Sequence, residues 1–387
     1  MESAVCSFSL RSVFVRVRFS VSVAVYNAGV DYLARQRRFQ QTLEKEKCDG
    51  FLVTNSANLR YLCGYSGSNG LLLFIAGRKV FFTDGRYTAQ ARHEVKGARV
   101  VISRGALIKD ACALISMLKA AVMGFEADLT TVAAAQQARE LTHKRIQWKG
   151  TSGLIMRQRM VKDAEELELI RAAVKLGAQV YELALKSLRP GVAEIEVAGK
   201  LEYAARRAGA DGMSFETIVA AGKRGALPHG RASTAPVPRR GFVVMDSGVI
   251  LRGYCSDMTR TVHVGRAGRS EREWYQAVLD AQLAGIAAVR AGVTASDVDE
   301  AARGVLCKAR LDRYFTHSTG HGVGLEIHEP PRLGKAQAER LEPGMVITIE
   351  PGIYVPEKGG IRIEDMVVVT AGGAEVLTPV TKRLIEV

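Results

Sequence analysis

Five side chains that follow residue 240 have the types expected of a divalent-cation site. They are Asp246, Asp257, His321, Glu350 and Glu364. Four carboxylates and one imidazole form a mostly oxygen ligand set, which suits Mn²⁺, Co²⁺ or Fe²⁺ better than the thiolate-rich sites of structural zinc. Two such ions about 3.5 Å apart can share a water and convert it to hydroxide near neutral pH. The residues therefore predict metal-dependent hydrolysis.

A first hairpin is predicted to pair two of these acids. Asp246 and Asp257 are equally far from a point between Leu251 and Arg252, and Gly253 beside that point is a favourable turn residue. Directly opposed residues of an antiparallel hairpin have Cβ atoms about 5 Å apart. The two aspartates are therefore expected to face each other across two strands.

A second hairpin is predicted to pair Glu350 with Glu364 about a loop centred on Glu357. Strand alternation puts Arg362, Glu364 and Met366 on one face. Buried carboxylates packed this closely repel each other, at a cost of several kcal/mol, unless a cation joins them. The pairing therefore favours a bound metal.

The histidine of this set lies in a glycine-rich segment, STGHGVGLEIHEPP (318–331), where small neighbours let the backbone approach a bound group. The zincin motif is excluded because Arg332, and not histidine, follows His328 by four residues. The three glycines miss the dinucleotide-binding spacing, and the chain contains no GxSxG nucleophile motif.

The elements before these motifs predict a smaller α/β domain over residues 31–155. Short apolar strands alternate there with helical patterns, which is typical of this class. The expected helices cover 31–47, 107–119 and 132–142, and the expected strands cover 50–54, 71–75 and 79–84.

The remaining residues, 156–387, predict an α+β domain with a curved antiparallel sheet and two similar halves. Two capping boxes mark helix starts, Asp163 with Glu166 and Ser270 with Glu273. The expected helices run from 163 to about 189, 194 to 208, 270 to 290 and 294 to 310, and the expected strands cover 241–246, 253–264, 345–350 and 361–369.

Composition sets further limits. The chain has 387 residues and a formal charge of +14, but no nucleic-acid-binding motif accompanies that charge, and no apolar run is long enough to span a membrane. Six scattered cysteines without a CxxC pair favour a reducing, cytoplasmic compartment. In residues 1–30 arginines interrupt a Ser/Val-rich run, which excludes the unbroken apolar core of a secretion signal. The segment is predicted to be a disordered or non-native extension, with a transit-like peptide as the alternative.

Several segments together resemble a known family. They are TNSANLRYLCGYSGSNG (54–70), FTDGRYTAQA (82–91), GALPHGRAS (225–233), MDSGVILRGYCSDMTRT (245–261), HSTGHGVGLEIHEPP (317–331), EPGIYVP (350–356) and GIRIEDMVVVT (360–370). In order and spacing they are similar to the Xaa-Pro metallopeptidases of the creatinase, aminopeptidase P and prolidase family. That resemblance implies a pita-bread catalytic domain after a creatinase-type N-terminal domain.

The resemblance also implies a role for each site residue. It implies two divalent ions per subunit, Mn²⁺ foremost with Co²⁺, Fe²⁺ or Zn²⁺ as alternatives, and a homodimer or larger homo-oligomer. Asp246 would chelate one ion, His321 and Glu350 the other, and Asp257 and Glu364 would bridge them. His229 and His328 would bind substrate and assist proton transfer, Glu350 would move the proton, and His317, Arg362 and Tyr354 would orient the site.

The implied reaction is hydrolysis of the bond before proline by a hydroxide that bridges the two metals. The leading expectation is an Xaa-Pro aminopeptidase acting on peptides, and the alternative is an Xaa-Pro dipeptidase. A remoter alternative is a non-enzymatic peptide-binding or chaperone module, which usually loses metal ligands. The segment from Lys223 to Arg240 contains five basic residues and no acid, so it could bind a dipeptide carboxylate or form a solvated loop.

Overall fold

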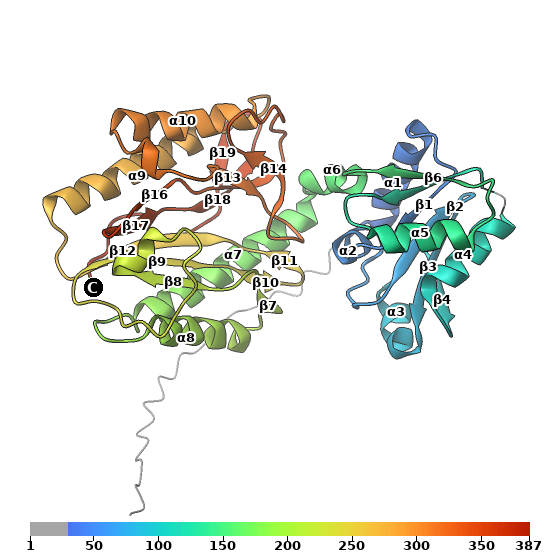
Figure 1. Ribbon diagram of the computed structural model, residues 1–387, viewed down its shortest axis with the longest axis horizontal. Helices are drawn as coiled ribbons and strands as arrows, with labels where there is room; N and C mark the ends of the chain where they lie inside the picture. The colour runs from blue at the N-terminus through green and yellow to red at the C-terminus, as the bar shows by residue number, and fades with distance from the viewer. Residues whose placement is uncertain (1–29, 119) are drawn as a thin grey trace, which may run out of the picture.

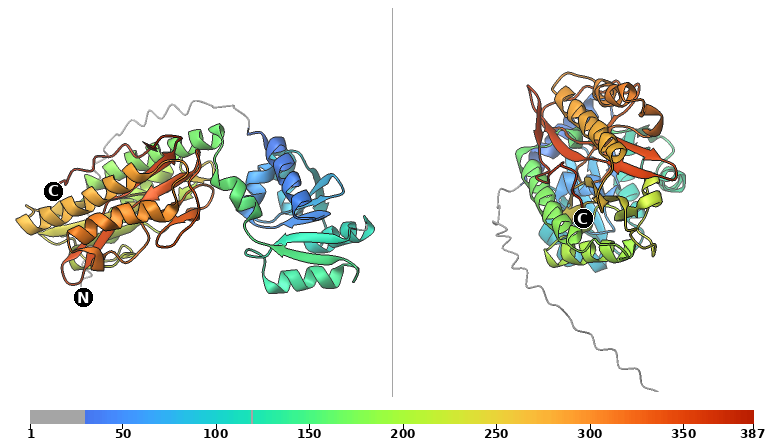
Figure 2. Two further views of the ribbon diagram at one scale, coloured as in Figure 1. Left: turned by 90° about the horizontal axis from the view of Figure 1, so that it is seen from above. Right: turned by 90° about the vertical axis from the view of Figure 1, so that its left-hand side faces the viewer.

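The computed structural model describes residues 30–118 and 120–387. The extension predicted for residues 1–30 therefore lies almost wholly outside the described residues. Two lobes lie end to end, with helix α6 (Leu154–Met160) at their junction (Figure 1). The two additional views in Figure 2 show the same separation into an N-terminal and a C-terminal lobe.

The N-terminal lobe is a six-stranded mixed sheet between two layers of helices. Its strand order is β4-β3-β2-β1-β5-β6, with β1–β5, β5–β6 and β3–β4 parallel. The elements are α1 (Tyr32–Lys45), β1 (Gly50–Val53), α2 (Ser56–Cys63), β2 (Leu71–Ile75), β3 (Arg78–Asp84), η1 (Gly85–Tyr87), α3 (Thr88–Glu94), β4 (Arg99–Ser103), α4 (Leu107–Met117), β5 (Val122–Glu126), α5 (Val132–Leu141) and β6 (Gln147–Thr151).

Burial explains why the strands of this lobe are continuous apolar runs. Helices α1, α2 and α3 pack on one face of the sheet, around Phe39 and Phe51, whereas α4 and α5 pack on the other, around Ile115. Both faces of β1 and β2 are therefore inaccessible to water, and every residue of these strands is buried. The predicted α/β class of this lobe is confirmed.

Four helices of the C-terminal lobe form two pairs. They are α7 (Ala164–Leu185), α8 (Glu194–Arg207), α9 (Arg269–Ala288) and α10 (Ala295–Lys308), and the lobe also contains the short helices η2 (Gly222–Ala226) and η3 (Asp312–Tyr314). Helix α7 packs with α8, and α9 packs with α10. None of the helices in the described ranges combines the length and the apolar character that a bilayer crossing requires.

One predicted capping box is confirmed and the other is wrong. Asp163 caps α7 by accepting from the Glu166 N–H, and the Glu166 carboxylate accepts from the Asp163 N–H. Helix α9 begins at Arg269, before the expected Ser270, and the carboxylate that accepts from the cap N–H belongs to Glu271. Gly268 supplies that N–H without a side chain of its own, so the sequence carries no conventional N-cap signal there.

Glu271 is expected to stabilise the protein in a pH-dependent way. Burial raises the pKa of Glu271, but hydrogen bonds from the Gly268 N–H and Arg240 outweigh this effect and bring the pKa to about 2. The unfolded value is about 4.3, so this stabilisation is complete above that pH and disappears as the pH falls toward 2. We expect Glu271→Gln to lower the free energy of unfolding at pH 7 but not at pH 2, measured by urea denaturation. Exposed Glu273→Gln is the control, and a pH-independent difference would contradict the assignment.

Short antiparallel strands build the rest of this lobe, and they confirm the α+β pita-bread class. They are β7 (Gly212–Met213), β8 (Ile218–Ala221), β9 (Gly241–Ser247), β10 (Val249–Leu251), β11 (Tyr254–Cys255), β12 (Met258–Val264), β13 (Gly320–Gly322), β14 (Glu329–Leu333), β15 (Val346–Ile349), β16 (Gly352–Val355), β17 (Gly359–Arg362), β18 (Asp365–Val369) and β19 (Ala374–Val376). Their sheets are β11-β10-β7, β12-β9-β8, β14-β13-β15-β18-β19 and β16-β17. The strands lie between the two helix pairs (Figure 1).

The first hairpin register was predicted wrongly by two residues. Asp246 pairs with Thr259, and the turn lies between Arg252 and Gly253. Both of these residues have positive φ, 50° and 82°, as a type I′ turn requires. Because the error is an even number of residues, the expected faces of the strands are unchanged.

The second hairpin register is confirmed. Ile349 pairs with Asp365 in one ladder and Gly352 pairs with Arg362 in the next, so Glu350 and Glu364 lie opposite each other between the two ladders. Glu357 stands at the centre of the loop with φ 63°.

Candidate metal centre

One cavity of about 930 Å³ collects the predicted site residues. All ten of them line it: Asp246, Asp257, His321, Glu350, Glu364, His229, His328, His317, Arg362 and Tyr354. They come from both antiparallel layers and from the loop after η2, so no single segment of the chain makes the site.

Three of the five candidate ligands lie where strands are interrupted. Asp257 separates β11 from β12, Glu364 separates β17 from β18, and Glu350 follows the last residue of β15. The sequence had predicted one continuous strand through Asp257 and another through Glu364. At such breaks the backbone leaves one ladder and enters another, and the side chain can be directed into a cavity.

His321 lies among three carboxylates. Ligand atoms of Asp257, His321 and Glu364 all lie within 4.8 Å of one another. His321 Nε2 is 3.3 Å from Glu350 Oε1 and 3.6 Å from Asp257 Oδ2. His321 Nδ1 is 2.9 Å from the Gly322 carbonyl oxygen, an acceptor, so the proton belongs on Nδ1 and Nε2 is left as a metal ligand.

The electrostatics of the cluster fit a bound cation. Burial, reinforced by neighbouring carboxylates, raises the pKa of Asp257 and Glu364 well above the usual range, and burial also raises the pKa of Glu350. Asp246 Oδ1 is buried without a hydrogen-bond partner in the described part of the chain. Divalent cations would let all four acids ionise and would satisfy that oxygen.

A hydrogen-bonded chain orients the site. The Arg362 side chain is buried and donates to Asp246, to the Tyr354 hydroxyl at 2.7 Å and to Thr259 Oγ1 at 3.0 Å. The Tyr354 hydroxyl lies 2.9 Å from His317 Nε2, and the other ring nitrogen lies 2.8 Å from the Ser318 carbonyl oxygen. Burial lowers the pKa of His317, so its ring is neutral and acts within this chain.

Two threonines support the acids and were not predicted. Thr259 Oγ1 donates to Glu364 at 2.7 Å. Thr348 Oγ1 donates to Glu350 at 3.0 Å and accepts from the His321 N–H at 3.0 Å. Thr348 lies two residues before Glu350, so strand alternation could have identified it. Thr259 lies on β12, far from Glu364 in the sequence, and no local pattern could have identified it.

Three polar side chains on the cavity wall remain available to a ligand. His229 and His328 are exposed, and neither ring has a hydrogen-bond partner among the residues described. Arg332 is also exposed on this wall, and it lies opposite His321 in the ladder between β13 and β14. Arg231, in the basic segment noted from the sequence, is instead paired with Glu216 at 2.8 Å.

The chain combines an α/β lobe with an α+β lobe that holds a buried cluster of carboxylates and a histidine. This combination indicates a metal-dependent hydrolase. Residues 168–371 match Metallopeptidase family M24, and residues 35–161 match the Creatinase/Prolidase N-terminal domain. The chain belongs to metallopeptidase family M24 and is a peptidase, and the family implies divalent metal ions as cofactors.

Relatives cover nearly the whole chain. An Xaa-Pro dipeptidase of Pyrococcus horikoshii is 32% identical over 351 residues, which are 90% of this chain and 98% of the relative. The structure of an Xaa-Pro dipeptidase from Bacillus anthracis matches with a TM-score of 0.89 and 38% identity, over 92% of this chain and 100% of that one. An X-Pro aminopeptidase from Thermotoga maritima MSB8 matches with a TM-score of 0.84 and 33% identity, over 90% and 100%.

Proposed function

We propose that this protein is an Xaa-Pro dipeptidase that uses two divalent ions, with Mn²⁺ as the metal. Similarity to proteins named Xaa-Pro dipeptidases favours this activity over the aminopeptidase activity expected from the sequence. The observation that carries the proposal is the guanidinium of Arg332, which lies beside the candidate metal centre and has no acidic partner among the residues that the structure describes.

Arg332 is suited to bind the free carboxylate of a dipeptide. Because it is the cross-strand partner of His321, the two Cβ atoms lie on the same side of the sheet, about 5 Å apart. The other arginines of the cavity have acidic partners, Asp246 for Arg362 and Glu216 for Arg231. The terminal carboxylate of a substrate that is two residues long would thus meet a cation close to the scissile bond.

The five candidate ligands would hold the metals. Asp246 would chelate one ion, His321 and Glu350 the other, and Asp257 and Glu364 would bridge them, consistent with the mutual approach of Asp257, His321 and Glu364. Bound there, the two ions supply Lewis-acid polarisation of the peptide carbonyl and an activated water.

The remaining side chains would handle charge and protons. His229 and His328 would donate hydrogen bonds to the carbonyl oxygen as negative charge develops on it. Glu350 would carry a proton to the prolyl nitrogen that leaves. An Xaa-Pro bond has no N–H for a protease to grip through a backbone ladder, and nothing in this set requires one.

The most direct test of substrate length compares Ala-Pro with Ala-Pro-Ala in the presence of Mn²⁺. We expect release of free proline from the dipeptide and little cleavage of the tripeptide. Efficient cleavage of Ala-Pro-Ala would make the protein an aminopeptidase. No cleavage of either peptide would contradict the proposed enzyme.

The role of Arg332 predicts a substrate-specific defect. Arg332→Ala removes a charge-assisted hydrogen bond worth about 1.5–3 kcal/mol, so kcat/KM for Ala-Pro should fall by about 10- to 150-fold. Ala-Pro amide lacks the carboxylate, and its residual cleavage should not change. Arg231→Ala, on the same wall but already paired with Glu216, is the matched control. An equal loss for both substrates would show that Arg332 does not recognise the carboxylate.

A further inference from the structure

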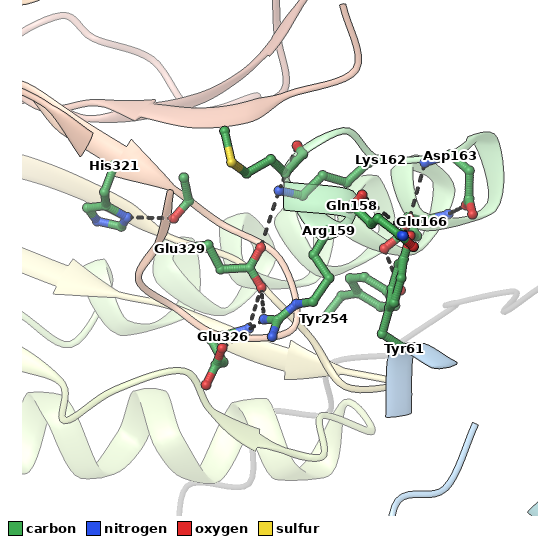
Figure 3. Close-up of polar contacts among 12 residues, drawn as sticks. Tyr61, Gln158, Arg159, Lys162, Asp163, Glu166, Tyr254, His321, Glu326 and Glu329 are labelled. Atoms are coloured by element: carbon green, nitrogen blue, oxygen red, sulfur yellow. Dashed lines mark hydrogen bonds and ion pairs between the residues drawn. The ribbon is translucent and has the colours of Figure 1, made fainter. Parts of the chain in front are cut away.

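A buried cluster of charges joins the N-terminal lobe to the loop that links the two site histidines. Arg159 of α6 is 1% exposed and donates to Glu326 at 2.8 Å, to Glu329, and to the Asn58 side-chain oxygen at 2.7 Å. Lys162 approaches the other oxygen of Glu329 at 3.4 Å. Figure 3 shows Arg159 and Lys162 reaching Glu329 from the helical side, with His321 beyond it. We call these five residues the Arg159 cluster.

Glu329 connects this cluster to the candidate metal centre. It follows His328 directly and pairs with Gly322, the neighbour of His321, where β13 meets β14. Its carboxylate also accepts from the Glu326 N–H at 3.0 Å, which closes the loop between the histidines. The rings of His321 and His328 meet edge to face with centroids 4.5 Å apart.

The lack of a side chain at Gly324 leaves room for the Glu329 carboxylate. A β-carbon at Gly324 would lie 2.6 Å from Glu329 Oε2. Burial raises the pKa of Glu329, but Lys162 and Arg159 lower it below the usual value, so the buried acid is ionised and held between two cations. A carboxylate fixed in this way restrains the backbone that carries both histidines.

We propose that Arg159 is a positioning residue, through which the N-terminal lobe holds the loop 322–329 and so orients His321 toward the metal and His328 toward the substrate. The inference rests on the proposed function, since it assigns those two histidines to the site. Asn58 extends the restraint into the N-terminal lobe, because its amide donates to buried Glu126 at 2.6 Å.

The test replaces Arg159 with Met and measures Mn²⁺ affinity by titration calorimetry and kcat on Ala-Pro. Glu329 keeps Lys162 as a partner, so the variant is expected to fold. Loss of a group that orients metal ligands typically lowers affinity or activity by about 10- to 100-fold, and we expect a fall of that size. Arg159→Lys keeps the positive charge but lacks the planar guanidinium, so its Mn²⁺ affinity and kcat should lie between those of the parent and of the Met variant. If Arg159→Met does not fold, Arg159→Lys takes its place in the comparison.

Arg35→Met is the matched control. Arg35 is as buried as Arg159 and also joins the lobes, through Asp163 and Glu166 at 2.7 and 3.1 Å, but it does not contact loop 322–329. A fall in Mn²⁺ affinity or kcat that is confined to the Arg159 variants supports the proposal. Unchanged values, or an equal fall in Arg35→Met, overturn it. Parent protein that binds Mn²⁺ but does not cleave Ala-Pro would contradict the proposed function alone, because the affinity comparison still decides the role of Arg159.

Discussion

Glu350→Gln should lower kcat on Ala-Pro by about 10²- to 10⁴-fold, the usual contribution of a general acid or base. The amide has nearly the same shape as the carboxylate and still accepts a hydrogen bond from Thr348, but it cannot take up a proton. Steady-state kinetics at saturating Mn²⁺ and substrate measure the effect.

The matched control for this change is Glu357→Gln on the same hairpin. Glu357 is 77% exposed and forms a surface ion pair with Lys223, which contributes little to stability. Its replacement should leave kcat unchanged. If Glu350→Gln retained the parent kcat, Glu350 would be excluded as the proton carrier.

Arg362→Met should destabilise the metal-free protein by about 3–5 kcal/mol, the typical cost of removing one partner from a buried ion pair. Arg362 is 3% exposed, and its guanidinium is the cation that contacts Asp246. Without it the acids of the site lose a neutralising charge, and Thr259 and Tyr354 lose their donor. Urea unfolding after exhaustive chelation gives the free energy.

The double variant Arg362→Met with Asp246→Asn separates charge from packing. Removing the Asp246 charge as well removes the acid that Arg362 contacts directly, so part of the lost stability should return. A single-variant effect below about 1 kcal/mol, within the range of exposed pairs, would show that Arg362 does not neutralise the cluster.

The fold was largely predictable because its signals are local. The Asp163 capping box, the apolar strands of the first lobe and the α+β class after it all follow from short-range patterns. The start of α9 was not predictable, because Gly268 contributes only a backbone N–H. The proposed domain boundary near residue 155 falls within α6, and it stays a prediction.

The gathering of the candidate site residues was predictable from the sequence, but the side chains that contact them were not. The predicted register at Asp246 was wrong by two residues, but an error of two residues leaves each side chain on the expected face of its strand. All the predicted residues therefore line one cavity, as expected. Arg332 depends on the register of β13 and β14, which shifts after His321. Thr259 reaches Glu364 from another hairpin, and Arg159 depends on how α6 packs against the loop after β13. Such contacts join segments far apart in the chain, and no local pattern reports them.

Metal stoichiometry tests the proposed two-metal centre. Purified protein should be stripped with chelator, titrated with Mn²⁺ and analysed by calorimetry together with elemental analysis, in parallel with Glu364→Gln. We predict two Mn²⁺ per chain for the parent protein and a loss of tight binding in the variant, because Glu364 lies with Asp257 and His321 in the cluster of candidate ligands. Parent protein that binds no Mn²⁺, or a Glu364→Gln variant that binds two ions as tightly as the parent, would contradict the proposed two-metal centre.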